Sequence, residues 1–130
     1  MMELGITTAL TTTFDDAVER TRGALQQQGF GVLTEIDMQA TLKAKLDEDI
    51  ERYLILGACN PQLAHRAVGL NRQIGLLLPC NVVVRADGDE VVVEAMNPQL
   101  MVEVTDDPEL AVVADEAATR LRTAIESLAD

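Results

Sequence analysis

The sequence predicts an α+β fold: an antiparallel sheet with two main helices packed on one face and two small helices inserted between strands. Three observations carry this prediction. Two valine-rich segments flank the turn Asp87-Gly88-Asp89, which is typical of a β-hairpin. Apolar residues recur every three or four positions after Pro108, which is typical of an amphipathic helix. The remaining strand-like segments alternate with helix start signals.

The first quarter of the chain reads as strand, helix and strand. Gly5–Thr11 is rich in threonine and aliphatic residues and predicts the first strand. Thr13 is the expected N-cap of a helix that ends at Gln28, since its hydroxyl can accept from the backbone N–H of Asp16. Gly29 supplies a left-handed stop, and a second strand is expected over 30–36.

Two short helices are predicted around a third strand. Asp37 is the expected cap of a helix over Met38–Leu46, which presents one narrow apolar stripe. After an acidic loop, the apolar run Tyr53–Cys59 predicts a strand. Asn60-Pro61 then pairs a capping residue with proline at the first helical position, so a helix is expected to begin there and to close at Gly69 or Asn71.

The second half is expected to hold a hairpin and the longest helix. A loop through Gly75 leads to strands over Pro79–Ala86 and Glu90–Met96, which should pair antiparallel. The stretch after Pro98 has no periodic pattern and is expected to be irregular. A last helix is predicted from Pro108 to about residue 128.

Composition and charge restrict the class of partner. The 130 residues suffice for one domain, expected over 1–130. A net charge of -12 and 2% aromatic residues argue against nucleic acid and against an anionic membrane surface. No apolar run approaches the length of a membrane span, and no basic leader precedes an apolar stretch at Met1–Leu10. We therefore expect a cytoplasmic protein with no membrane partner.

The two cysteines mark the candidate site. Cys59 closes one expected strand and Cys80 opens another, and each is followed by an asparagine, Asn60 or Asn81. If these two strands pair antiparallel, both sulfur atoms fall at the same edge of the sheet. The four residues are therefore our candidate ligand-binding residues, for a small molecule or a thiophilic metal.

Three interpretations of the cysteines stay open. With His65, which lies six residues after Cys59, the two thiols could hold zinc or another thiophilic metal, and Met96 could add a soft sulfur at the same edge. Cys59 alone could be the reactive thiolate of an enzyme, because it precedes a helix N-terminus. Alternatively, Cys59 and Cys80 are small buried apolar residues of a module without a site. The sequence names no cofactor.

The acidic residues give weaker indications. Glu35 and Asp37 could form a carboxylate pair on one strand face, although Asp37 has a simpler role as a helix cap. The run 47–51 lacks the glycine and spacing of an EF-hand and is expected to be a solvated loop. Nucleotide-binding glycine motifs and the nucleophile motif of serine hydrolases are absent from the sequence.

Three ordered segments together resemble domain-of-unknown-function family 302. They are Gly29–Asp37, Tyr53–Pro61 and Ile74–Val84, and they include both Cys-Asn pairs. The likeness covers nearly the whole chain. The motif residues that carry over are Glu35, Asp37, Gly57, Cys59, Asn60, Pro61, Gly75, Pro79, Cys80 and Asn81. Where the family commonly has a glycine, this chain has Asp47.

The resemblance implies a fold and an assembly but no reaction. It implies a topology similar to one repeat of the TATA-binding protein, with strand order one, five, four, three, two, and it implies a homodimer. In that order Cys59 and Cys80 share one end of the sheet, and Asp37 lies at the opposite end. The resemblance does not imply nucleic-acid binding, because fold and function separate readily and this chain is acidic.

Overall fold

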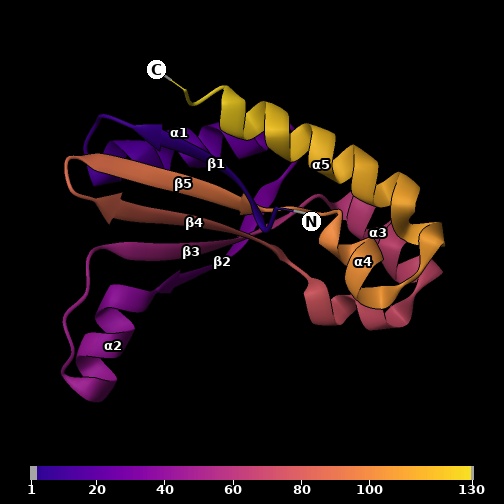
Figure 1. The fold of residues 1–130 in the computed structure, drawn as a ribbon, viewed down its shortest axis with the longest axis horizontal. Helices are drawn as coiled ribbons and strands as arrows, with labels where there is room; N and C mark the ends of the chain where they lie inside the picture. The colour runs from indigo at the N-terminus through magenta and orange to yellow at the C-terminus, as the bar shows by residue number, and fades with distance from the viewer. Residues whose placement is uncertain (1–2, 130) are drawn as a thin grey trace.

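The computed structural model describes residues 3–129, so Met1, Met2 and Asp130 of the expected domain lie outside the described residues. The elements follow one another in the order drawn in Figure 1. They are β1 (Gly5–Leu10), α1 (Phe14–Gln27), β2 (Gly31–Asp37), α2 (Met38–Leu46), β3 (Tyr53–Cys59), α3 (Pro61–Leu70), η1 (Arg72–Leu77), β4 (Cys80–Asp87), β5 (Glu90–Met96), α4 (Leu100–Thr105), η2 (Pro108–Leu110) and α5 (Ala111–Glu126).

The five strands form one antiparallel sheet in the order β1-β5-β4-β3-β2, which confirms the expected α+β topology. The hairpin between β4 and β5 turns at Gly88, whose φ of 60° is left-handed and favours glycine. The register of β2 on β3 shifts between Val32 and Thr34, where one extra residue, Leu33, bulges out of the ladder.

Local capping explains why helices begin where the sequence predicts. The Thr13 hydroxyl accepts from the Asp16 N–H at 3.1 Å and begins α1. The Asp37 carboxylate accepts from the Ala40 N–H at 2.9 Å and begins α2. Each bond satisfies one of the free N–H groups of a first turn. Gly29, with φ 84°, ends the turn after α1 as expected.

Helices α1 and α5 cover one face of the sheet and contact each other (Figure 1), as predicted for the two main helices. Alternate strand residues point into the core between these layers. The fully or nearly fully buried members include Leu10, Leu25, Leu56, Val82, Val84, Val93, Leu121 and Ile125. Aliphatic packing therefore stabilises the domain with few aromatic residues.

A second apolar cluster lies beyond the ends of the strands. There α3, α4 and η2 pack against the first half of α5, and η1 packs against α3 and α4 (Figure 1). The buried members are Leu63, Ala67, Ile74, Met101, Leu110, Val113, Ala114 and Ala117. Helix α5 is thus shared by both clusters, and the junction between them lies where β3 passes into α3.

Three elements differ from the sequence prediction. The stretch expected to be irregular contains α4, which follows a turn where the Asn97 side chain accepts from the Gln99 N–H at 3.0 Å. The loop through Gly75 is the 3-10 helix η1, capped by Asn71. The last helix begins with the 3-10 turn η2 before it becomes α5 at Ala111. Short helices have too few turns to leave a periodic apolar pattern.

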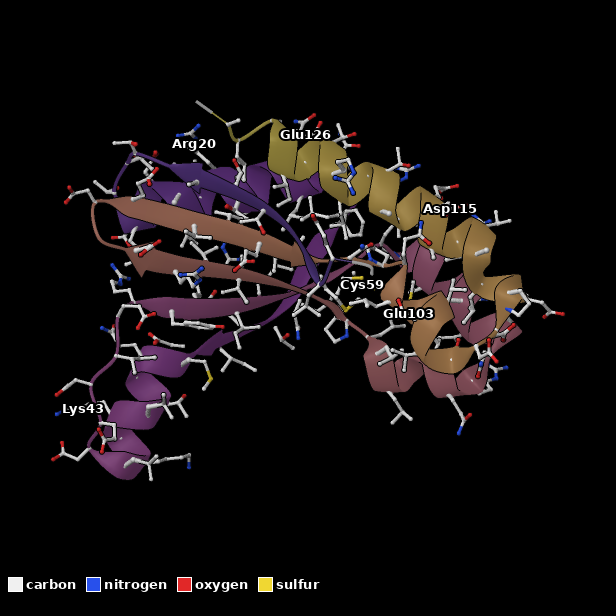
Figure 2. All side chains as sticks on the ribbon, viewed as in Figure 1. Arg20, Lys43, Cys59, Glu103, Asp115 and Glu126 are labelled. Atoms are coloured by element: carbon white, nitrogen blue, oxygen red, sulfur yellow. The ribbon has the colours of Figure 1, made fainter. Side chains whose placement is uncertain are left out.

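Helix α2 stands apart from both clusters. It contacts β2 and β3, and none of its residues is buried. Figure 2 shows Lys43 of α2 well away from Cys59, which lies at the junction of the two clusters. Among the residues described, we find no helix with the length and apolar character needed to cross a membrane.

Candidate functional site

The register of β3 brings the two cysteines to one end of the sheet. Cys80, the first residue of β4, pairs with Ala58, and Cys59 pairs with Gly31 on the other neighbouring strand. The antiparallel pairing of the strand that closes at Cys59 with the strand that opens at Cys80 is therefore confirmed. Cys59 lies one residue beyond Ala58, the partner of Cys80, so the two cysteines lie close together on adjacent strands although their side chains start from opposite faces of the sheet.

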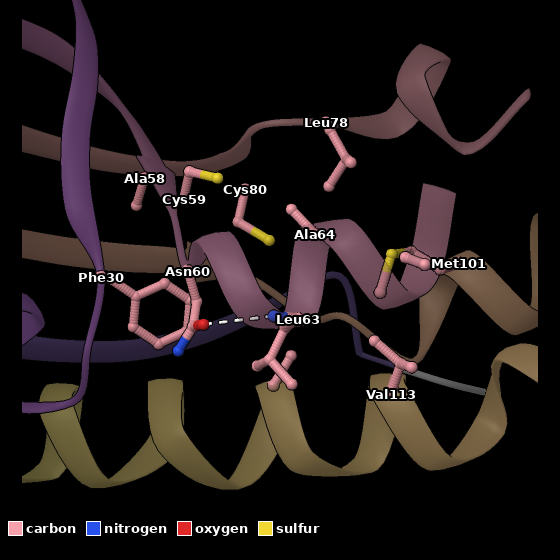
Figure 3. A pocket seen from close by; sticks show the side chains of 12 residues that line it. Phe30, Ala58, Cys59, Asn60, Leu63, Ala64, Leu78, Cys80, Met101 and Val113 are labelled. Atoms are coloured by element: carbon pink, nitrogen blue, oxygen red, sulfur yellow. Dashed lines mark hydrogen bonds between the residues drawn. The ribbon is translucent and has the colours of Figure 1, made fainter. Parts of the chain in front are cut away.

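Both thiols face a small apolar pocket at the junction of the two clusters. Figure 3 shows the sulfur atoms of Cys59 and Cys80 pointing toward the space beside Ala64 and Leu78. The volume open to a water-sized atom is about 20 Å³. The lining residues are Phe30, Ala58, Cys59, Asn60, Leu63, Ala64, Ala67, Leu78, Cys80, Met101, Val113 and Ala117.

Asn60 aligns the start of α3 with this pocket. Its side-chain oxygen accepts from the Leu63 N–H at 3.2 Å, and the residue is 9% exposed (Figure 3). Pro61 follows at the first helical position, where its missing N–H costs no hydrogen bond. Cys59 therefore lies directly before the N-terminus of a ten-residue helix, the end with a positive partial charge.

Gly57 lets the strands approach closely beside the cysteines. A β-carbon at this position would collide with the Thr34 hydroxyl and would lie 2.8 Å from Cγ of Pro79. Thr34 pairs with Gly57 on β2, and Pro79 directly precedes Cys80. Glycine is required here because Thr34 and Pro79, on the two sides of β3, leave no room for a β-carbon.

Burial governs the acidity of both thiols. Burial raises the pKa of the Cys59 thiol above its ordinary value. Burial, and then the nearby Cys59 thiol, raise the pKa of Cys80 to about 11. Both groups therefore carry their protons at neutral pH, because burial raises the pKa of each thiol.

Comparison with known proteins identifies the family. The model of the family described as "Domain of unknown function DUF302" matches residues 6–128 of this chain. The chain belongs to the DUF302 family.

A solved structure supports this DUF302 assignment. The chain is similar to the crystal structure of an uncharacterized conserved DUF302 protein from Bacillus stearothermophilus, with 29% sequence identity and a TM-score of 0.90. The similarity covers 96% of this chain and 98% of the other. None of the curated proteins matches this chain.

The other predicted site residues of this DUF302 domain lie outside the pocket. His65 is exposed on α3, and Asn81 is exposed on β4, where it pairs with Gly57. Met96 ends β5 at the same end of the sheet and pairs with Gly5. Within residues 3–129, no three His, Cys, Asp or Glu side chains come close enough together to hold a metal ion.

The carboxylates considered as an acid and base pair lie toward the opposite end of β2. Glu35 forms an ion pair with Arg22, and Asp37 caps α2. Both line a second, more polar pocket of about 210 Å³, which is separate from the cysteines. Since Asp37 pairs with Leu54, at the far end of β3 from Cys59, the expected separation of Asp37 from the cysteines is confirmed.

Sequence reasoning missed the walls of the DUF302 pocket. Met101 comes from α4, Leu78 follows η1, and Val113 lies on α5. The first two belong to segments expected to be irregular. Their only signal in the sequence is apolar character, which does not distinguish the lining of a pocket from an ordinary core.

Proposed function

We propose that this DUF302 domain binds a thiophilic metal ion between the thiols of Cys59 and Cys80. One observation carries the proposal: two soft donors, from different strands, face one small pocket with apolar walls. Cysteine sulfur binds zinc and copper(I) as the thiolate, so the metal must displace both thiol protons.

The size of the pocket favours an ion over a small organic ligand. Organic ligands usually occupy pockets of roughly 300–1,000 Å³. A volume of about 20 Å³ accommodates little more than one water-sized species. The small-molecule alternative would require the pocket walls to move apart.

The acidity of the thiols disfavours the alternative of an enzyme that uses Cys59 as its nucleophile. Nucleophilic cysteines generally have lowered pKa values. The pKa of Cys59 is raised instead, with burial as the cause. The remaining alternative, a structural or interaction module, predicts that replacing either cysteine leaves all binding properties unchanged.

The test is metal titration of the purified, fully reduced chain under anaerobic conditions. We expect one zinc or copper(I) ion per chain to bind, with loss of binding in Cys59→Ser and in Cys80→Ser. Circular dichroism and thermal unfolding of each variant check that the fold is kept. Metal binding by a folded Cys80→Ser chain at wild-type strength would remove the proposal.

Two free thiols are also compatible with a reducing compartment such as the cytoplasm.

We also propose that the domain forms a homodimer through the surface of β2 and α2. Three exposed apolar residues lie on these two elements: Leu33 is 67% exposed, Ile36 47% and Leu46 65%. A nine-residue helix with no buried residue is marginally stable in water without tertiary contacts. A second copy that covers this surface would bury apolar area and stabilise α2.

Charges around this surface support a second copy as the partner. A groove between β2 and α2 is lined by Ile36, Ala40, Ala44 and Lys45, and by Glu35 and Asp37, whose carboxylates also pair with Arg22 and cap α2, respectively. Both lysines of this acidic chain lie on α2. A surface with apolar residues and both signs of charge can complement itself across a two-fold axis.

The oligomeric state tests this second proposal. Light scattering coupled to size-exclusion chromatography should give the mass of a dimer for the wild type. Leu46→Glu should shift the chain toward the monomer, because it places negative charge in the apolar part of the interface. Leu76→Glu, at a leucine of η1 that is still more exposed (83%), should leave the dimer intact. A monomeric wild type, or equal effects of both variants, would contradict the proposed interface.

A further inference from the structure

The cysteine site has two strong donors and no third one of the kind zinc requires. Zinc in proteins is almost always held by four tetrahedral ligands, or by three and a water. The chain contains two cysteines, and across the described part of the chain no cluster of three His, Cys, Asp or Glu residues could hold a metal. His65, the one histidine, is exposed and is absent from the pocket lining.

The remaining polar group at the pocket is already committed. The side-chain oxygen of Asn60 accepts the N–H of Leu63, so it serves the cap of α3. The other lining residues are apolar or, in the case of Met101, carry a soft thioether. A metal at this site thus meets two thiol sulfurs and a wall of hydrocarbon.

This donor set matches a monovalent soft ion. Copper(I) prefers sulfur ligands, and two thiolates satisfy it in a linear arrangement without water. The walls of the pocket, which include Leu63, Ala64 and Leu78, limit the access of water and oxygen that would oxidise the bound ion. Cys59, the more exposed thiol, is the first to meet an incoming ion, and Cys80 is the buried second ligand.

We propose that the site selects copper(I) over zinc and holds it through the Cys59 and Cys80 thiolates alone. This inference rests on the metal-binding function proposed above and specifies its ligand. On binding, each thiol loses one proton to solvent and each sulfur donates an electron pair to copper(I). The product is a bis-thiolate complex with one net negative charge, and the copper oxidation state does not change.

The position of α3 fits the charge of that complex. The helix has ten residues, and its N-cap, Asn60, directly follows Cys59. The partial positive charge of a helix N-terminus stabilises an adjacent anion. A zinc complex with the same two thiolates would be neutral and would still lack two ligands.

The test compares two metals on the reduced, full-length chain. Copper(I) is titrated in competition with bicinchoninate, and zinc in competition with a chromophoric zinc chelator. We expect one copper(I) per chain, lost in both Cys59→Ser and Cys80→Ser, and zinc binding at least about 100-fold weaker. X-ray absorption at the copper edge should give two sulfur neighbours. Met101→Leu, which is close in volume, should change copper affinity by less than about tenfold.

The outcomes separate this inference from the proposal on which it rests. Thiol-dependent zinc binding as tight as copper(I) binding would overturn copper selectivity and leave metal binding intact. Three or more copper ligands, or a large loss of affinity in Met101→Leu, would overturn the two-thiolate assignment. If neither metal binds, or if folded cysteine variants bind as the wild type does, both proposals fail. Cys59→Ser keeps this test decisive if Cys80→Ser does not fold, because Cys59 is only partly buried.

Discussion

The hydroxyl of Thr34 fills the space that a β-carbon on Gly57 would need. The two residues face each other across β2 and β3, two positions before the strand ends at Cys59. On the other side of Gly57 lies Pro79, which leads into Cys80. The missing side chain of Gly57 therefore sets how closely three segments meet beside the two thiols.

Gly57→Ala should destabilise the domain through overpacking. We expect the free energy of unfolding to fall by about 1–3 kcal/mol, since the added methyl group collides with Thr34 and Pro79. The double variant with Thr34→Ala should recover part of this loss. Gly31→Ala is the matched control, because its β-carbon would have nothing within 4 Å, and its effect should stay within about 0.5 kcal/mol. Urea unfolding gives these values, and equal losses at both glycines would contradict the steric argument.

Asn60→Ala should cost about 1 kcal/mol of stability, because it removes the cap that accepts the Leu63 N–H. Asn60→Asp keeps an acceptor oxygen and should recover most of that stability. Thermal unfolding measures both effects. If Asn60→Asp is as unstable as Asn60→Ala, the cap bond is not the source of the stability.

The pKa of Cys80 predicts a loss of stability at alkaline pH. The folded chain holds this proton up to about pH 11, whereas the ordinary thiol value is 9.0. Stability is complete below pH 9.0, where both states keep the proton, and it falls above that pH because the unfolded chain alone releases its proton. The expected loss by pH 11 is about 2–3 kcal/mol.

Chemical unfolding across this pH range, in wild type and Cys80→Ala, isolates the contribution of this thiol. The variant is less stable throughout because it has lost buried volume, but its stability should fall less steeply between pH 9 and 11. Parallel curves for the two chains would mean that Cys80 titrates normally in the folded state.

Alkylation should distinguish the two cysteines. Cys59 is partly buried and Cys80 is buried, so iodoacetamide should modify Cys59 first. The rate at Cys59 should be slow at neutral pH and should rise up to and beyond the pH of a free thiol, because its pKa is raised. Peptide mass spectrometry follows each site. Rapid modification of Cys59 at pH 6 would instead indicate an activated thiolate.

Local signals in the sequence were sufficient for most elements. Thr13, Asp37 and Asn60 each accept an N–H from their own first helical turn, a bond that spans three residues and depends little on the rest of the chain. Helix α4 left no such signal: it has six residues and begins without a side-chain cap bond at Gln99. It therefore looked like an irregular segment, although Met101 on it is buried.

The sequence by itself determined the strands, the main helices and the presence of exactly two thiols at strand ends, because these depend on residue type, period and capping over a few neighbouring positions. Only the tertiary structure decided which residues surround those thiols. The pocket is made by β3, β4, α3, α4 and α5 together, and His65 lies outside it because its place on α3 faces solvent. Such an arrangement depends on how helices pack beyond the ends of a sheet, and packing of this kind is specified by many apolar contacts that no short motif records.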